Sequence, residues 1–392
     1  MARRLKHLML ATAEDPFDKK SWSGTPYRLR EALERRVEKV TVFRPSPPSR
    51  NLKDVALRMI FGGAKYPLWI TQATFRNNAR ELEAAIAKEK PEAVLSLSTM
   101  CIAELEKPGR PMFMFTDAPY LAFHEAYAGT ISVPRRLGWF GEREAQVARR
   151  LDGLFFSSEW AAREAVRFYG PLGLGGVAME TLTHTTPFGA VLVPSMSREM
   201  LLARVDARPK DRLELLFVGK DWERKGGALA LEVARLLRTG GERVKLHIVG
   251  CTPELPADAA EYVELHGLLR QDVAEEWGRM LELFLDSHFL IVPTQAECFG
   301  IVFAEAHAFA LPPISRAVQA LPGVVKDGET GLLFDPAAGA GEYVERILRL
   351  RGEPGAYREM AVKARERFEG YLNWDWTARE MVRVMEEVVD RG

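Results

Sequence analysis

Two glutamates, Glu297 and Glu305, stand eight positions apart in the segment with the clearest capacity for ligand chemistry. The apolar run at residues 289–293 is typical of a buried parallel strand, and a helix-compatible run at residues 301–310 follows Gly300. Amides near that helix start lie between the two carboxylates, and free amides at a helix N-terminus attract anions. The segment suits a ligand with a phosphate in the middle and hydroxyls at both ends, which is the layout of a nucleotide-sugar.

The residues around this pair resemble the E-x7-E signature of family 4 glycosyltransferases, which are retaining enzymes of the GT-B fold. The resemblance rests on Glu-Cys-Phe-Gly at residues 297–300, Glu-Ala at 305–306 and Leu-Pro-Pro-Ile at 311–314. It implies that Glu297 holds hydroxyls of the donor sugar and that Glu305 holds the ribose diol. The other donor-binding candidates in this segment are Phe299, Gly300 and Ile301. Without the resemblance, the ordinary interpretation would be a solvated loop charge and an exposed helix residue.

A second motif contains two lysines, Lys220 and Lys225, between an apolar run at residues 213–219 and a helical pattern at 229–237. Lysines at a strand end can bracket a diphosphate with point charges while the helix amides add donors. The family usually has arginine at the first position, so Lys220 lacks the bidentate fork. Arg224 either compensates for that loss or is a surface charge. A basic loop is common on surfaces, and its place beside the glutamate motif favours donor binding.

The first half of the chain offers three further candidates. Gly24, in Trp-Ser-Gly-Thr-Pro, resembles the family's first loop, where glycine lets the backbone approach the donor phosphates; an ordinary turn is the alternative. Asp117 follows a predicted strand where many family members have a histidine that touches the donor sugar. It is either a catalytic or sugar-orienting residue or a turn former. His124, seven residues later, is expected to be packed rather than to bind a ligand.

Residues 263–269 resemble the short strand whose backbone contacts the nucleobase in relatives, which makes His266 and Gly267 donor-binding candidates. Backbone recognition leaves no side-chain code, so UDP-sugars and GDP-sugars both remain open. Gln319 and Ala320 stand where relatives usually have a glycine pair, a departure near the expected donor sugar.

The length of 392 residues predicts two domains of roughly 150 to 200 residues each. Alternating strand and helix patterns favour parallel sheets covered by helices. Together with the resemblance, this predicts an α/β GT-B fold with two Rossmann-like domains facing each other across a cleft. The expected parts are an N-terminal acceptor-side domain at 1–189, a donor domain at 190–370 and a C-terminal helix at 371–392 that returns to the first domain.

Composition narrows the function further. No apolar run approaches the ~20 residues of a membrane-spanning helix. The three cysteines, Cys101, Cys251 and Cys298, lack metal-ligand spacing and fit a reducing cytoplasm. The sequence has no Asp-x-Asp pair and no His or Cys cluster at ligand spacing, so neither a metal nor another cofactor is expected.

The net charge of zero is unevenly spread, because residues 1–80 carry 17 Lys and Arg against 7 Asp and Glu. This basic part is interpreted either as a surface for an anionic membrane or a phosphorylated acceptor, or as a solvated surface. No nucleic-acid partner is expected.

The sequence therefore predicts a retaining, cytoplasmic glycosyltransferase that is either free in the cytoplasm or peripheral at the inner membrane face. It would move a hexose from a UDP- or GDP-sugar to a hydroxyl of a glycan, lipid or small-molecule acceptor by same-face, metal-independent displacement. The catalytic candidates are Glu297, Lys225, Lys220 and Asp117. A nucleotide-sugar epimerase of the GT-B fold and a non-catalytic sugar-binding homologue remain as alternatives.

Overall fold

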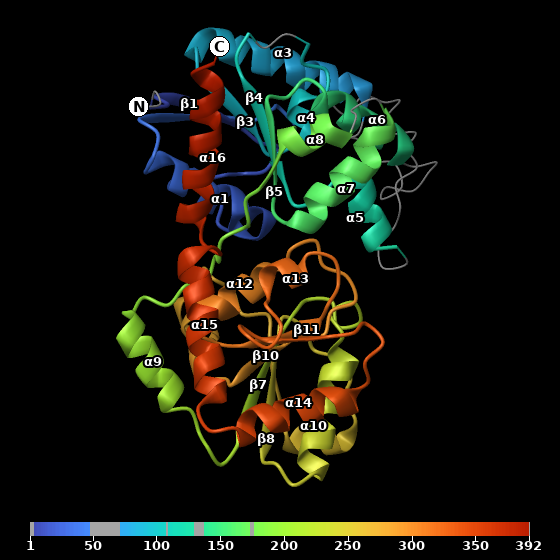
Figure 1. The fold of residues 1–392 in the computed structure, drawn as a ribbon, viewed down its shortest axis with the longest axis vertical. Helices are drawn as coiled ribbons and strands as arrows, with labels where there is room; N and C mark the ends of the chain where they lie inside the picture. Colours follow the sequence, from blue (N-terminus) through green and yellow to red (C-terminus); the bar gives the residue numbers. More distant parts are fainter. Residues whose placement is uncertain (1–3, 48–70, 107–108, 129–136, 173–175, 392) are drawn as a thin grey trace. The chain divides into compact units, whose positions relative to one another are not determined.

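A computed structural model describes residues 4–47, 71–106, 109–128, 137–172 and 176–391. The chain divides into two compact units, one made of Met1–Val191 with Trp374–Gly392 and the other of Leu192–Asn373 (Figure 1). Within the basic N-terminal part, residues 1–3 and 48–70 lie outside the described residues.

The first unit is built on a six-stranded sheet with the strand order β2-β1-β3-β4-β5-β6. All of its neighbouring strands pair in parallel. The central strands are buried along their whole length, which explains why they appear in the sequence as unbroken apolar runs. The strands are β1 (His7–Ala11), β2 (Lys39–Phe43), β3 (Ala93–Ser96), β4 (Met112–Thr116), β5 (Gly153–Phe156) and β6 (Thr183–Thr185).

Helices connect these strands, and several begin at a hydroxyl side chain that accepts a first-turn amide, as Thr71, Ser98 and Ser158 do. The helices are α1 (Thr25–Glu34), α3 (Gln72–Glu89), α4 (Thr99–Ile102), α5 (Tyr120–Ala126), α6 (Leu137–Ala148), α7 (Glu159–Tyr169) and α8 (Gly176–Leu182). Two short 3₁₀ segments, η1 (Ser21–Gly24) and η2 (Gly170–Leu172), precede α1 and follow α7.

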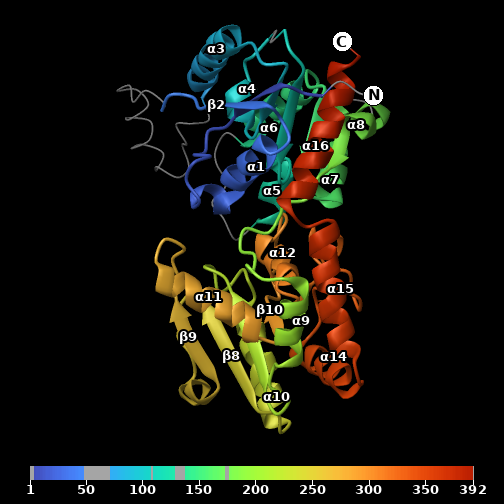
Figure 2. The ribbon, with the colours of Figure 1, turned by 90° about the vertical axis from the view of Figure 1, so that its left-hand side faces the viewer.

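The last helix, α16 (Trp374–Val389), belongs to the first unit and packs beside α1 (Figure 2). The Thr377 hydroxyl donates to the Pro187 carbonyl at 2.5 Å, and Arg36 pairs with Asp375. A Cβ on Gly189 would stand 2.3 Å from the Trp374 amide nitrogen, so only glycine allows this approach. The expected return of the C-terminal helix to the first domain is confirmed.

The second unit has its own six-stranded parallel sheet, with the order β12-β11-β10-β7-β8-β9. Two such sheets in one chain confirm the expected Rossmann-like architecture. The strands are β7 (Leu213–Val218), β8 (Val244–Val249), β9 (Val263–Gly267), β10 (Phe289–Ile291), β11 (Pro313–Arg316) and β12 (Leu332–Phe334).

Two sets of helices pack against this sheet. Helix α10 packs with α14, whereas α9 contacts both α11 and α15, and α12 contacts α15. The elements are α9 (Arg198–Asp206), α10 (Gly227–Thr239), η3 (Ala257–Glu261), α11 (Ala274–Asp286), α12 (Ile301–Ala308), α13 (Leu321–Val324), α14 (Ala340–Gly352) and α15 (Ala356–Gly370). Helix α9 lies in a stretch of mixed sequence at residues 191–212. It buries only Leu201 and Val205 and so gives little periodic signal.

The two motifs singled out in the second half of the sequence lie on neighbouring strands. Strands β7 and β10 pair in parallel, with Phe289 opposite Leu215. The carboxyl ends of parallel strands meet at one edge of a sheet, and ligands bind beyond that edge in open α/β sheets. The loops that carry the lysines and Glu297 therefore lie side by side, although they are about 70 residues apart in sequence.

Candidate functional site

Hydrogen bonds tie the loop after β7 to the loop after β10. The Arg224 carbonyl accepts from the Gln295 amide at 2.8 Å and from the Thr294 hydroxyl at 3.2 Å. In return, the Arg224 guanidinium donates to the Ala296 carbonyl at 3.0 Å. Arg224 also pairs with Asp221 at 3.3 Å, so it acts as a clamp between the loops rather than as a free surface charge. Thr294 and Gln295, which drew no attention in the sequence, complete this clamp.

Gly226 brings the first loop against the second. It has φ of +74°, and a Cβ there would stand 2.1 Å from the Pro293 carbonyl oxygen. Only glycine fits both conditions. Gly226 also forms the N-cap of α10, so the residue before it, Lys225, is held directly before that helix.

Lys225 and Glu297 form an ion pair at the centre of this site, through the Lys225 Nζ and Glu297 Oε2. Their side chains are only 13% and 11% exposed. The Arg224 Nη1 lies 3.8 Å from the same carboxylate oxygen. The structure therefore brings together three of the predicted site residues, and they share one partly buried carboxylate. Lys220 is exposed at the end of β7.

Gly300 sets the junction between Glu297 and helix α12. It has φ of +80° as the N-cap of α12, and its missing side chain leaves room for Glu297, whose Cγ would lie 2.9 Å from a Cβ there. The first-turn amides of a helix have no intrahelical acceptor, and they carry part of the positive end of the helix dipole. The Ile301 end of α12 is thus an anion-attracting end next to the Lys225–Glu297 pair.

Gln319 stands at one position of the glycine pair that relatives usually have, and its conformation explains how another residue fits there. It adopts φ of +38°, a left-handed conformation that glycine takes without strain and other residues rarely adopt. Its Oε1 accepts from the Glu297 amide at 3.1 Å. The free-energy cost of this backbone conformation is therefore offset by a hydrogen bond that fixes the Glu297 backbone.

The other donor-binding candidates, Glu305, His266 and Gly267, contact residues other than the Lys225–Glu297 pair. Glu305, on α12, accepts from the Leu192 amide at 3.0 Å and so holds the first residue of the second unit. Gly267 ends β9 with φ of +63°, and its carbonyl accepts from the Gly250 amide at 2.7 Å. The His266 ring lies 3.1 Å from the His247 ring, between Nε2 and Nδ1 respectively.

The sequence has no His cluster at ligand spacing, but the fold brings two histidines and a glutamate together. Among the described residues, ligand atoms of His247, Glu264 and His266 lie within 4.8 Å of one another. The sequence did not show this group because His247 lies on a different strand, β8, from the other two. The detectable signal was the alternation Lys-x-His in β8 and Glu-x-His in β9, which places these side chains on one face of the sheet.

Gly24 and Asp117 lie in the first unit. Gly24 has φ of +83° as the N-cap of α1, and a Cβ there would stand 3.0 Å from the Lys19 carbonyl oxygen. The Asp117 carboxylate accepts from the Thr116 hydroxyl at 3.4 Å, and its carbonyl accepts from the Ser157 hydroxyl at 3.1 Å. His124 is buried between aromatic rings, as expected for a packed histidine, and burial lowers its pKa.

Sequence reasoning missed Glu144 on α6, a buried carboxyl group in the first unit. It accepts from the Tyr120 amide at 2.7 Å and from the Thr99 hydroxyl at 3.2 Å. Burial raises its pKa to about 7, and Asp117 adds to the increase. Nothing in the sequence distinguishes it from an ordinary helical glutamate. Glu144 ties the starts of two helices that follow β3 and β4, at the edge that carries Asp117.

Comparison with known proteins finds a family match in the second unit and more distant relatives of the chain. The family model described as glycosyl transferases group 1 matches residues 202–367. A D-inositol 3-phosphate glycosyltransferase of Thermomonospora curvata is 28% identical over 261 residues, 62% of this chain and 58% of that protein. One of Streptomyces bingchenggensis is 27% identical over 263 residues, 63% of this chain and 55% of that protein. The chain thus spans less than two thirds of the length of these curated relatives.

Solved structures share the fold. The sucrose-phosphate synthase of Thermosynechococcus elongatus has a TM-score of 0.65 at 18% identity, covering 99% of this chain and all of that one. Anabaena HepE in complex with UDP has a TM-score of 0.61 at 14% identity, covering 98% of this chain and 100% of that one. The fold is GT-B, and residues 202–367, most of the second unit, match the family of group 1 glycosyl transferases. Among the described residues, no helix combines the length and apolar character needed to cross a membrane.

We predict that Gly226→Ala destabilises the second unit more than Gly328→Ala does. Both glycines have φ of +74°, but a Cβ on Gly328 meets nothing within 4 Å, whereas one on Gly226 meets Pro293. Each variant should lose about 1–2 kcal/mol from the left-handed backbone, and Gly226→Ala should lose ~1–3 kcal/mol more because the loops must separate. Urea unfolding of both variants measures this difference. Equal losses would mean that the loop contact is not tight.

We also predict a pH-dependent effect of Glu144→Gln. The folded state keeps the Glu144 proton up to about pH 7, whereas the unfolded chain loses it near 4.5. Stability from this group is therefore present at low pH and lost as the pH rises through that window, by up to ~3 kcal/mol. The variant cannot titrate, so its stability relative to the parent should increase between pH 4.5 and 7.

Thermal unfolding at several pH values tests this prediction, with the exposed Glu159→Gln on α7 as the matched control. That control should run parallel to the parent protein. A Glu144→Gln curve that also runs parallel to the parent would show that Glu144 titrates normally.

Proposed function

We propose that this protein transfers a sugar from a nucleoside diphosphate sugar to an acceptor hydroxyl, with the donor bound by the second unit. The diphosphate would lie between Lys225, Lys220 and the first amides of α12 near Ile301. Glu297 would hold hydroxyls of the donor sugar. Glu305 would accept from the ribose diol, and the backbone at His266 and Gly267 would contact the base.

The observation that supports this proposal most is the Lys225–Glu297 pair at the start of α12. A cation that is already near a carboxylate, an arginine and a helix N-terminus gives a compact site where sugar hydroxyls and phosphate can be bound together. Phosphate groups favour such helix ends because the amides and the dipole both attract negative charge. The family match over residues 202–367 supports the same arrangement, since Glu297 and Glu305 lie within it and resemble the family's glutamate pair.

In the proposed reaction, the bond between the anomeric carbon and the leaving phosphate oxygen breaks ahead of acceptor attack. The acceptor oxygen forms the new bond on the same face, and its proton moves to the leaving phosphate oxygen. Negative charge therefore grows on the diphosphate in the transition state. Lys225 and the α12 amides would stabilise this charge as it develops, without a divalent ion.

The acceptor would be a hydroxyl of a glycan, a lipid or a small molecule, and Asp117 would orient it or the donor sugar from the first unit. Asp117 is suited to this because it follows the carboxyl end of β4, where ligands bind in open sheets. The similarity to D-inositol 3-phosphate glycosyltransferases makes a phosphorylated polyol one acceptor to include in assays.

An assay of the purified protein with UDP- and GDP-sugars tests the function. Transfer, or slow sugar release in the absence of acceptor, is the expected result, and product NMR should show that the anomeric configuration is retained. Deuterium from solvent incorporated into the sugar ring would indicate the epimerase instead. If the protein neither hydrolyses nor transfers the sugar of any donor tested, that result would support a non-catalytic homologue.

We predict different consequences for the two glutamates. Glu305→Ala should weaken binding of the free nucleoside diphosphate by about 10- to 100-fold, because a hydrogen bond to a charged group contributes about 1.5–3 kcal/mol. Glu297→Ala should lower turnover with free-nucleotide affinity unchanged or higher, since Lys225 would lose its competing carboxylate.

Isothermal titration calorimetry with UDP and GDP, together with turnover assays, separates these effects. Glu305→Gln is the control for folding, because its amide oxygen can still accept from Leu192. Equal loss of free-nucleotide affinity in the Glu297 and Glu305 alanine variants would contradict the two assignments.

Lys225→Ala should lower turnover by roughly a hundredfold or more, because a well-placed donor to developing charge commonly contributes ~3–4 kcal/mol. Lys220→Ala should have a similar or milder effect. Lys363→Ala on α15, an exposed lysine paired with Glu359, is the matched control and should keep full turnover.

The same assays should proceed at an unchanged rate in EDTA, below the unfolding temperature. Loss of activity in EDTA with recovery in magnesium or manganese would show that a metal, rather than the lysines, neutralises the diphosphate.

A further inference from the structure

The open face of strands β8 and β9 carries polar side chains that the proposed transfer reaction does not use. Lys245 and His247 on β8 share this face with Glu264 and His266 on β9, because side chains two apart on a strand point the same way. His247 lies directly opposite Glu264 in the strand pairing. Two imidazoles and a carboxylate are thus placed together on one surface.

The distances between these side chains match the edges of a metal site. The His247 Nδ1 and His266 Nε2 are 3.1 Å apart. Glu264 has one oxygen 3.7 Å from His247 Nδ1 and the other 3.6 Å from His266 Nε2. Ligands bonded to Zn²⁺ at about 2.0–2.1 Å in a tetrahedron stand ~3.3 Å from one another. Small side-chain rotations would bring all three to one ion.

Glu214 on β7 orients the His247 ring. Its Oε2 lies 3.0 Å from His247 Nε2, and the carboxylate is buried and also paired with Arg212. A carboxylate on one ring nitrogen places the proton there and leaves the other nitrogen, Nδ1, with its lone pair toward Glu264 and His266. Histidines that bind metals commonly have such a partner.

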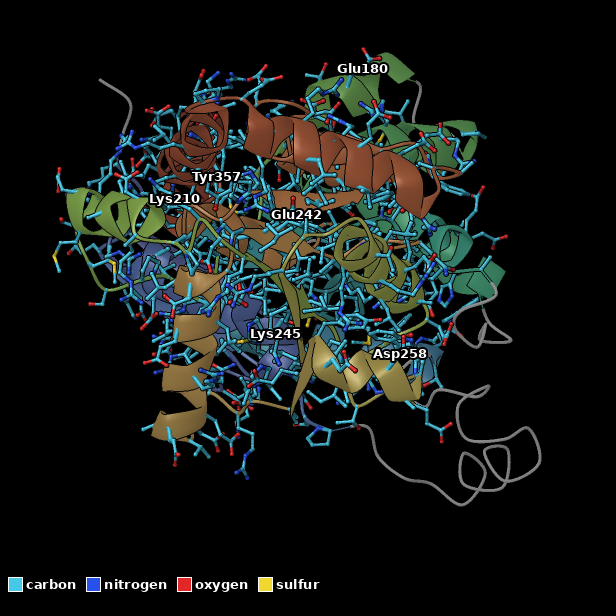
Figure 3. The ribbon with its side chains drawn as sticks, turned by 90° about the horizontal axis from the view of Figure 1, so that it is seen from below. Glu180, Lys210, Glu242, Lys245, Asp258 and Tyr357 are labelled. Carbon is cyan, nitrogen blue, oxygen red and sulfur yellow. The ribbon has the colours of Figure 1, made fainter. Side chains whose placement is uncertain are left out.

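A groove gives solvent access to the candidate ligands, and cationic side chains lie near them. His247 and Glu264 line a groove of about 860 Å³ beside α11, which provides an entry path and room for a water as fourth ligand. Figure 3 views the chain from below and labels Lys245 and Glu242, which also line this groove. Lys245 and Arg279 weaken the attraction for a cation. The Arg279 guanidinium, however, contacts Glu264 at 3.2 Å and lies 3.9 Å from Glu282, to which it can turn.

We propose that His247, Glu264 and His266 form a binding site for a divalent transition-metal cation of the zinc type, with Glu214 as a positioning residue. Imidazole and carboxylate ligands suit zinc, whereas magnesium prefers oxygen ligands alone. The ion would join the edge strand β9 to β8. The proposed transfer reaction uses the backbone of His266 and not its side chain, and zinc binding is measured without a donor, so the two proposals stand or fall separately.

Calorimetric titration of tag-free, EDTA-stripped protein with zinc chloride tests the site. One zinc ion per chain is expected, with no comparable binding of magnesium and with a higher thermal unfolding midpoint in zinc. X-ray absorption should show nitrogen and oxygen ligands at about 2.0–2.1 Å. Absence of stoichiometric zinc binding would overturn the proposal.

Variants assign the ligands. His247→Ala and the more exposed Glu264→Gln should each lower zinc affinity at least tenfold, and Glu214→Gln should lower it by about 10- to 100-fold while leaving the stoichiometry at one. His7→Ala, which removes a histidine from β1, should bind zinc as the parent does. Unchanged zinc binding in both ligand variants would place the ion elsewhere, for example on the Cys251 thiol, and would refute the site.

Discussion

The Lys225–Glu297 ion pair is the interaction on which the arrangement of the second unit's site depends. Both side chains are mostly buried, and Arg224 lies close to the same carboxylate. A buried pair is weak evidence for stability, because desolvation of both charges offsets much of their attraction, but removal of one partner leaves an uncompensated charge. The ion pair matters here because it fixes the position of the lysine. The pair holds a cation beside the N-terminus of α12, where the proposed diphosphate would bind.

Unusual backbone conformations surround the same carboxylate. Gly226, Gly300 and Gln319 all have positive φ, and each contacts or approaches the segment that carries Glu297. Such conformations persist only where the surrounding contacts fix them, and they concentrate at functional sites. Here the hydrogen bonds of Arg224, Thr294 and Gln295 supply those contacts. Gln319 shows that a residue other than glycine is accommodated when its side chain returns a hydrogen bond to the site.

Much of this site was predictable from the sequence, because strand β10, the loop with Glu297 and helix α12 are contiguous in the chain. Lys220 and Lys225 were predictable because their loop is contiguous with strand β7 and helix α10. The pairing of β7 with β10 then explains why the two motifs meet. Glu144 was not predictable, since its burial depends on elements from three parts of the first unit. The group of His247, Glu264 and His266 depends on the register between β8 and β9, which no local pattern specifies. The role of Arg224 as a clamp likewise needed the partner loop.

A crystal structure of the complex with a nucleoside diphosphate tests the central claim most directly, because it locates the phosphates independently of activity. The account predicts phosphate oxygens within hydrogen-bonding distance of the Lys225 ammonium group and of the amides at the start of α12, with the ribose at Glu305. A diphosphate bound elsewhere in the second unit, or bound at this edge through a metal ion with Lys225 still paired only to Glu297, would contradict it.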